Sequence, residues 1–419
     1  MRRLLLLLLV ACSRPVYLGA EMPGACATRD IDGCLGWMVE RDLVAAELGV
    51  YDDAELRGYV QQVTDRLARG SLLARPPRVW IGDRDGTYAT VGGRIVVARP
   101  TLEKLATEAE LAGVIAHEMA HLEGGHTVAS LYGPAQDARW LVSRRDSEAI
   151  ADERAVVLLE RAGYAPVAMS RALRSVLIVE DEEHPAKDER IARVDKLALG
   201  RAGFEGRDEL LAGIEGMVVG RDTRLGVRVG DAWVVAALGL RIVIDDADVV
   251  RSDDDLFVAR QQRGTVTAYV IGTPWARELI ATLDDRATAR TDLGDAVTGT
   301  IPRAVADDDT PLGKLQQAIR GTLPQPAAGT RVAILARPRA SLVIELGDAR
   351  LSDVDLRVAT AEEIATAEPP RLALVPSPRT GAIGELGTCG PRLLDDPARH
   401  VRAGERIKCA GRLLTVIED

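Results

Sequence analysis

The 419-residue sequence predicts an α+β protein, in which helices and a small sheet come first and a β-rich region follows. Three observations support this prediction. Apolar residues recur at helical spacing in most segments before about residue 205. Near residue 90, short apolar runs flank a pair of glycines, as in a hairpin. Beyond about residue 205, runs of valine and isoleucine are separated by glycines, as in successive strands.

Helices are expected over 39–48, 54–67, 147–162 and 166–180. Asp52 or Asp53 is the expected N-cap of the helix over 54–67, because a short side-chain oxygen there accepts a backbone N–H. Thr101 is expected to open one further long helix that continues through Ile115. Gly163 marks the end of the helix over 147–162.

Strands are expected over 78–81, 88–98 with a turn at Gly92-Gly93, 225–244, 265–271, 331–335 and 341–346. The segment 284–330 is rich in Asp, Thr and Pro, with one short helical stretch over 312–319. Hydrophobic residues make up 47% of the chain and charged residues 28%, which is an ordinary globular balance. The net charge of −10 argues against nucleic acid as a partner.

The N-terminus has the pattern of an export signal. Met1-Arg2-Arg3 is basic, and the apolar run over 4–10 is too short to cross a bilayer core. Leu9-Val10-Ala11-Cys12 resembles the bacterial lipobox, which predicts lipidation of Cys12. Ser13 then favours the outer membrane. The alternative is an ordinary signal peptide with an incidental cysteine.

The other cysteines are Cys26, Cys34, Cys389 and Cys409. An even number in an exported chain suits disulfides, and two local pairs are the simplest arrangement. Reduced core cysteines are the alternative. No C-x-x-C spacing is present, so a structural zinc site of that type is not expected.

His117-Glu118-Met119-Ala120-His121 forms H-E-x-x-H, preceded by an apolar run typical of a helix. Two histidines four residues apart share one helix face, so both imidazoles can bind one zinc ion. Glu118 would then stand beside the bound water as general base. The alternative is a helix with two incidental histidines.

A catalytic zinc site needs a third protein ligand. His126 follows His121 by five residues, one fewer than the metzincin spacing, and is therefore not the predicted ligand. Glu148 is the better candidate, with Asp152 one helical turn later as a second carboxylate. Taken alone, such a pair is usually a solvated acidic face.

These motifs together resemble the HtpX/BepA-like gluzincins, a metallopeptidase family related to the prenyl-protein (CAAX) endopeptidases. The resemblance covers 78–195 and rests on the following segments: the strand pair over 89–97, H-E-x-x-H with a histidine five residues on, E-x-x-A-D over 148–152, A-G-Y-x-P over 162–166, and H-P over 184–185 followed by E-R-I over 189–191. The multi-spanning helices of the HtpX-type members are absent from the sequence.

The resemblance implies a zincin-like domain with one catalytic Zn²⁺ held by His117, His121 and Glu148. Glu118 would be the general base and Asp152 a residue behind the ligands or a proton donor. His184 would approach the metal from the side, or be an ordinary loop histidine. Arg190 would support the oxyanion or pair with Asp152. The strand at 95–98 is expected to bind substrate backbone by β-addition.

The expected organisation is a signal peptide over 1–11, a lipidated tether over 12–37, a zinc metallopeptidase domain over 38–204, a β-rich domain over 205–290 and a C-terminal α/β region over 291–419. We therefore expect a lipid-anchored zinc endopeptidase of the bacterial envelope that acts on misfolded envelope proteins. The alternative is an envelope chaperone or scaffold with a latent or plugged zinc site. A third hypothesis, a cell-wall-binding lipoprotein, rests on the C-terminal region alone.

Overall fold

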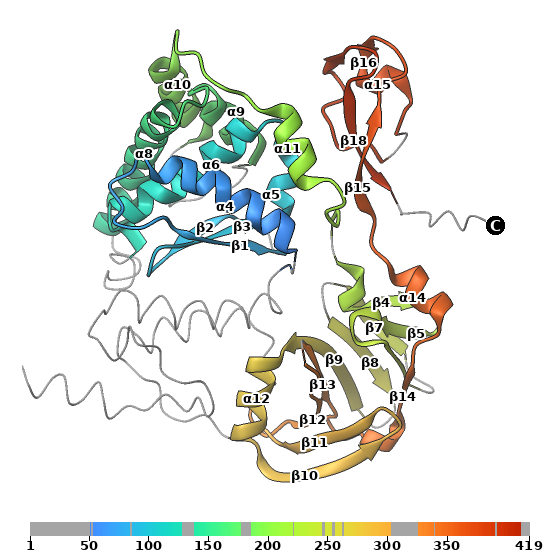
Figure 1. The fold of residues 1–419 in the computed structure, drawn as a ribbon. Helices are drawn as coiled ribbons and strands as arrows, with labels where there is room; N and C mark the ends of the chain where they lie inside the picture. The colour runs from blue at the N-terminus through green and yellow to red at the C-terminus, as the bar shows by residue number, and fades with distance from the viewer. Residues whose placement is uncertain are drawn as a thin grey trace, which may run out of the picture.

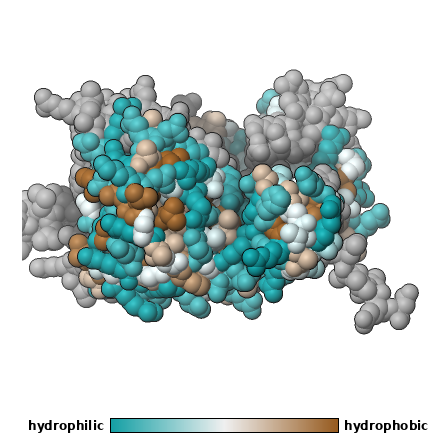
Figure 2. Space-filling model, turned by 90° about the horizontal axis from the view of Figure 1, so that it is seen from above, coloured by the Kyte–Doolittle hydropathy of each residue, from teal (hydrophilic) through white to brown (hydrophobic). Residues whose placement is uncertain are grey.

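The computed structural model describes residues 51–411, apart from 52, 84–85, 128–137, 177–185, 221, 245–247, 254–255, 262–263, 303–325, 339 and 390–391. Figure 1 shows a helical body above a small sheet, a β-rich middle body, and a hairpin near the C-terminus. Within the described residues, no helix is both long enough and apolar enough to cross a membrane. Figure 2 shows the surface from above, where apolar residues are interspersed among hydrophilic ones.

The first body holds most of the helices. In chain order its elements are α4 (Ala54–Ala68), β1 (Arg78–Gly82), β2 (Tyr88–Thr90), β3 (Arg94–Ala98), α5 (Arg99–Lys104), α6 (Glu108–Glu123), α8 (Ala138–Arg161), α9 (Ala168–Val176), α10 (Lys187–Ala198) and α11 (Arg207–Ile214). Asp53 caps α4 by accepting the backbone N–H groups of Glu55 and Leu56, which confirms one of the two expected N-caps. The helix α8 begins at Ala138, earlier than predicted, and Gly163 follows its end with a φ of 76°.

The small sheet has the order β1-β3-β2. Strands β2 and β3 form the predicted hairpin, and Gly92 and Gly93 in its turn both have positive φ, a conformation that favours glycine. Strand β3 pairs with β1 on one side and with β2 on the other. The expectation that the strand at 95–98 binds substrate by β-addition is therefore wrong, because β1 pairs with the whole strand on one side and β2 covers Ile95 and Val96 on the other.

The predicted long helix from Thr101 is two helices. Helix α5 ends after Lys104, and Leu105 is extended, with a ψ of 144°. Thr107 is the N-cap of α6, and its side chain accepts the N–H of Glu110 at 3.2 Å. The apolar spacing continues through the break because Leu102 and Leu105 are both buried in the same core as α6.

The middle body consists of two sheets that share a core. Its elements are β4 (Val227–Val229), β5 (Ala232–Val235), β6 (Leu240–Ile244), β7 (Asp248–Asp253), β8 (Leu256–Gln261), β9 (Gly264–Gly272), α12 (Thr273–Thr282), β10 (Asp284–Thr291), β11 (Gly294–Thr300), β12 (Arg331–Leu335), β13 (Ala340–Glu345), β14 (Val354–Val358) and α14 (Ala361–Ala367), with short 3-10 helices at Thr223–Leu225, Ala236–Leu238 and Leu351–Asp353. One sheet has the order β10-β11-β12-β13-β9-β8-β7 and the other β14-β6-β5-β4.

Trp233 and Ile242 of the smaller sheet pack against residues of the larger one, such as Leu342, in a common core. The sequence did not predict β10, β11 or α12. The larger sheet contains strands from both sides of residue 290, where one domain boundary was expected. The helical stretch expected over 312–319 lies outside the described residues.

The chain leaves the first body and returns to it at one place. The N–H of Val219 donates to the carbonyl of Pro370 at 2.8 Å, and the N–H of Leu372 donates to the carbonyl of Met217 at 2.8 Å. Leu372 belongs to the core of the first body. The middle body is thus inserted between two paired segments, and the chain after it completes the first body.

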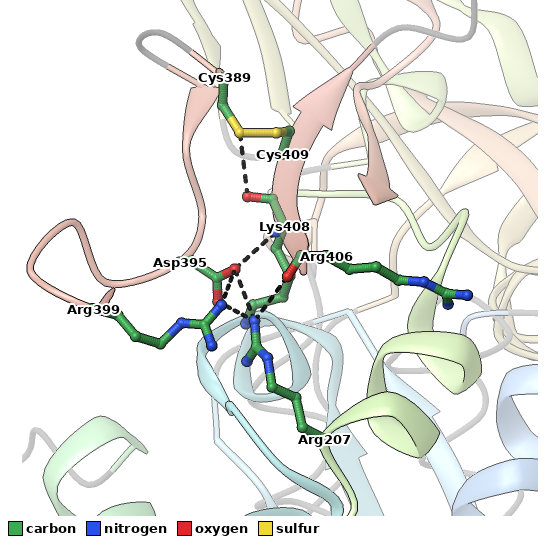
Figure 3. Close-up of a disulfide and its surroundings, with 7 residues drawn as sticks. All are labelled: Arg207, Cys389, Asp395, Arg399, Arg406, Lys408 and Cys409. Atoms are coloured by element: carbon green, nitrogen blue, oxygen red, sulfur yellow. Dashed lines mark hydrogen bonds and ion pairs between the residues drawn. A yellow bond between two sulfur atoms is a disulfide. The ribbon is translucent and has the colours of Figure 1, made fainter. Parts of the chain in front are cut away.

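The C-terminal hairpin consists of β15 (Arg371–Pro376), β16 (Gly381–Ala382), α15 (Ile383–Leu386), β17 (His400–Val401) and β18 (Arg406–Gly411). Cys389 and Cys409 are joined by a disulfide that closes a loop with a sequence separation of 20 (Figure 3). Lys408, only 1% exposed, donates from Nζ to the carbonyls of Glu103 and Leu105, both at 2.8 Å. This lysine ties the hairpin to the turn that precedes α6.

Asp395 makes the second attachment. It lies inside the disulfide loop, accepts the backbone N–H of Lys408 at 2.8 Å, and pairs with Arg207 of α11 at 3.1 Å (Figure 3). Asp395 is 7% exposed. The attachment is therefore a buried polar contact whose partners come from β18, from the loop before it and from the first body.

Candidate active site

Helix α6 carries the residues of H-E-x-x-H at its C-terminal end. His117 and His121 lie one turn apart, and their Nε2 atoms are 3.1 Å from each other. The opposite face of α6 is anchored in the core by Leu111, Ile115 and Met119, all with 0% exposure. The helix therefore presents both imidazoles on the side that faces away from its core contacts.

Helix α8 brings two carboxylates to these histidines. Glu148 Oε2 lies 3.3 Å from His117 Nε2, and Glu148 Oε1 lies 3.3 Å from His121 Nε2. Asp152, one turn later, has Oδ1 at 3.1 Å from His117 Nδ1. Ile150, between the two acids in sequence, is 59% exposed. At this turn α8 buries Glu148 and Asp152, at 6% and 0% exposure, and leaves the isoleucine exposed, which is the reverse of the usual distribution of polar and apolar side chains.

The donor atoms fit a zinc ion. One nitrogen each of His117 and His121 and one oxygen of Glu148 lie within 4.8 Å of one another. The nearest separations between these side chains are 3.1 Å and 3.3 Å. Ligand bonds of about 2.0–2.1 Å at tetrahedral angles would place zinc donors about 3.3 Å apart. Two imidazoles and a carboxylate are also one of the known ligand sets of catalytic zinc.

The charges around these atoms favour a cation. Burial alone would lower the pKa of His117, but hydrogen bonds to Asp152 and Glu148 raise that pKa to about 10. Burial alone would raise the pKa of Glu148, but hydrogen bonds from His117 and His121 lower it below the ordinary range. A metal ion would replace the proton that these carboxylates otherwise hold on the imidazole.

Arg190, from α10, holds Asp152 in place. Its Nε and Nη2 atoms donate to the two oxygens of Asp152 at 2.7 Å and 2.8 Å, and Nη2 lies 3.3 Å from Glu148. Burial raises the pKa of Asp152, but the hydrogen bonds from Arg190 and His117 outweigh it and lower the pKa. Of the two roles expected for Arg190, the structure shows the pairing with Asp152.

Glu118 stands beside the donor group without belonging to it. Its Oε2 accepts the backbone N–H of Ala89 at 2.8 Å. Removal of the carboxylate from water raises the pKa of Glu118 to about 7, although the charge of His117 opposes this rise. Ala89 lies in β2, so the edge strand of the small sheet contacts the H-E-x-x-H helix directly.

His126 is outside the donor group but contacts one member of it. Its Nδ1 atom lies 2.9 Å from Nδ1 of His121. The spacing argument concerned only direct ligation and did not predict this contact. The signal that could have predicted it is the preceding pair, Gly124-Gly125, which lets a chain end a helix and turn back.

The predicted site residues also include positions beyond the described part of the chain. His184, Cys12, Cys26 and Cys34 lie outside the described residues. Cys389 and Cys409 form the disulfide of the C-terminal hairpin and are not members of the donor group.

Comparison with known protein families gives one match to this region. Residues 54–142 match peptidase family M48. The matched range contains α4, the small sheet and H-E-x-x-H, and it ends before Glu148. No curated protein matches the chain. The match supports a metallopeptidase of family M48, and the group of His117, His121 and Glu148 is compatible with the metal site of such an enzyme.

Proposed function

We propose that this protein is a zinc-dependent endopeptidase. The observation that carries the proposal is the group of His117, His121 and Glu148 at zinc-donor separations, with the unligated carboxylate of Glu118 beside it. The family match supports the same class of reaction, because it includes the residues of H-E-x-x-H and the sheet next to them.

His117, His121 and Glu148 would hold one zinc ion, which polarises a scissile carbonyl and acidifies water when bound. Glu118 takes the proton of the attacking water, because its carboxylate is not a ligand and its pKa of about 7 suits a general base. The same carboxyl group then returns the proton to the leaving amine. Asp152 orients His117 through Nδ1, which keeps the Nε2 lone pair directed at the donor group.

The substrate chain is proposed to bind along β2. Strand β2 is an edge strand of its sheet, and the N–H of Ala89 in it contacts Glu118. An extended peptide added to this edge would pass beside both the base and the donor group. Strand β2 is thus proposed to take the substrate-binding role that was first expected of the strand at 95–98.

The cellular setting is proposed from the sequence. The lipobox-like Leu9-Val10-Ala11-Cys12 supports a lipid anchor on Cys12, and Ser13 supports the periplasmic face of the outer membrane. Polypeptides of the envelope, misfolded ones in particular, would then be the substrates. His184, which precedes α10 in the chain, is proposed to approach the zinc from the side and stabilise the oxyanion.

The test is metal content and casein cleavage by the chain from residue 13 onward, beside Glu118→Gln. A matched control is Glu153→Gln on α8, because the Glu153 side chain is 55% exposed and its ion pair with Arg193 is 3.9 Å long. We expect one zinc per chain in all three proteins, with cleavage by the wild type and the control only.

Two other outcomes would contradict the proposal. If the wild type binds zinc but cleaves nothing, the alternative of a chaperone or scaffold with a latent site is favoured. That alternative would then be tested by measuring whether the protein suppresses the aggregation of a denatured client. Absence of bound metal after zinc reconstitution would remove the basis for a metallopeptidase altogether.

A further inference from the structure

The two imidazoles of the donor group each have a second nitrogen that needs a partner. A histidine that binds zinc nearly always donates its other ring N–H to an acceptor, which fixes the tautomer and the ring orientation. For His117 the neighbour of Nδ1 is Oδ1 of Asp152, at 3.1 Å. For His121 the neighbour of Nδ1 is Nδ1 of His126, at 2.9 Å. The two rings are 5.1 Å apart between centroids and inclined by 69°.

The local chain is built to bring His126 to this position. Helix α6 ends at Glu123, and Gly125 has a φ of 66°, in the left-handed region that favours glycine. A Cβ atom on Gly124 would lie 2.5 Å from His126 Nε2 and 2.8 Å from its Cε1. The imidazole therefore packs directly on the backbone of Gly124. Gly125 thus supplies the backbone conformation of the turn, and Gly124 leaves room for the ring.

We propose that His126 is a positioning residue of the metal centre, which accepts a hydrogen bond from Nδ1–H of His121. In this arrangement His121 carries its proton on Nδ1 and directs the lone pair of Nε2 at the donor group. His126 carries its own proton on Nε2. His126 thus orients the ring of His121, as Asp152 orients the ring of His117. The proposal rests on the metal site of the proposed function and not on peptide cleavage.

The simpler interpretation is a histidine that only covers the end of α6. Under that interpretation, removal of the ring would change the stability of the helix end but not the affinity for zinc. The two interpretations therefore differ in zinc affinity, which is measured without any substrate.

The experiment compares zinc dissociation constants, measured by competition with a chromophoric chelator, for the wild type, His126→Ala and His126→Asn. Asparagine places an acceptor oxygen where Nδ1 of histidine stands, so it retains the hydrogen bond, whereas alanine removes it. We expect His126→Ala to bind zinc about 10–100-fold more weakly and His126→Asn to stay within about threefold of the wild type. His400→Ala is the matched control, because His400 is exposed and lies on β17 in the C-terminal hairpin.

A second variant tests the position of the ring without changing its chemistry. A Cβ on residue 124 would clash with the His126 ring and force it to shift, so we expect Gly124→Ala to weaken zinc binding in the same direction as His126→Ala. Unchanged zinc affinity in His126→Ala, or equal losses in His126→Asn and His126→Ala, would overturn the proposal.

The outcomes separate this proposal from the proposed function. Wild-type protein that binds zinc but cleaves nothing would refute the peptidase and leave the role of His126 measurable. Wild-type protein that binds no zinc would refute both.

Discussion

The disulfide between Cys389 and Cys409 is expected to stabilise the C-terminal hairpin by a predictable amount. Removing it opens a loop with a sequence separation of 20, and the chain-entropy relation for a loop of this length gives about 3 kcal/mol. Either single substitution, Cys389→Ala or Cys409→Ala, opens the same loop. The two single variants and the double variant should therefore lose the same free energy, and the losses should not add.

Hydrogen exchange of the amides of β18, read by mass spectrometry, measures this loss locally. A loss of about 3 kcal/mol corresponds to a fall in protection of more than about a hundredfold. Arg392→Ala is the control, since its side chain is exposed inside the same loop and forms no part of the crosslink. A double variant that loses twice as much as either single one, or protection that does not change, would refute the reasoning.

Three further predictions concern other parts of the molecule. Arg190→Met leaves Asp152 buried without its guanidinium partner, and we expect the free energy of unfolding in urea to fall by about 3–5 kcal/mol, against a smaller loss for Arg190→Lys. Burial raises the pKa of Glu345 above its ordinary 4.5, although Tyr269 opposes this rise by donating a hydrogen bond to the carboxyl group. The contribution of Glu345 to folding stability is therefore complete below pH 4.5 and is lost as the pH rises through the pKa of the folded state. Glu345→Gln should therefore show a smaller fall in Tm than the wild type between about pH 4 and about pH 8, and equal falls would contradict this assignment. Replacement of residues 222–368 by a short glycine linker should leave zinc binding intact, because the backbones of Val219 and Pro370 are hydrogen-bonded at 2.8 Å and a short linker can join them. Loss of zinc binding in a folded deletion variant would contradict this expectation.

The elements around the site were predictable where local pattern and tertiary structure agree. The hairpin at Gly92-Gly93 follows from turn chemistry, and the cap at Asp53 follows from its position before an apolar run. The carboxylates of Glu148 and Asp152 share a helix face, as their spacing of four residues requires.

The remaining features depend on contacts that the local sequence does not encode. The break between α5 and α6 leaves the carbonyls of Glu103 and Leu105 to be satisfied by Lys408, which lies some three hundred residues later in the chain. Strand β10 is exposed along most of its length and is held by its pairing with β11, so its sequence lacks the apolar alternation of a strand. The contact of His126 with His121 likewise depends on a turn geometry that residue spacing alone did not predict.

The inserted position of the middle body has a consequence for synthesis. The N-terminal part of the chain emerges first, including α6 with its histidines, yet Leu372 of its core and Lys408 beneath the start of α6 emerge only after the whole middle body has been made. Until then, the turn that leads into the H-E-x-x-H helix lacks the ammonium group that binds its carbonyls. We therefore expect the turn before α6 in the nascent chain to remain incomplete until the hairpin packs on it.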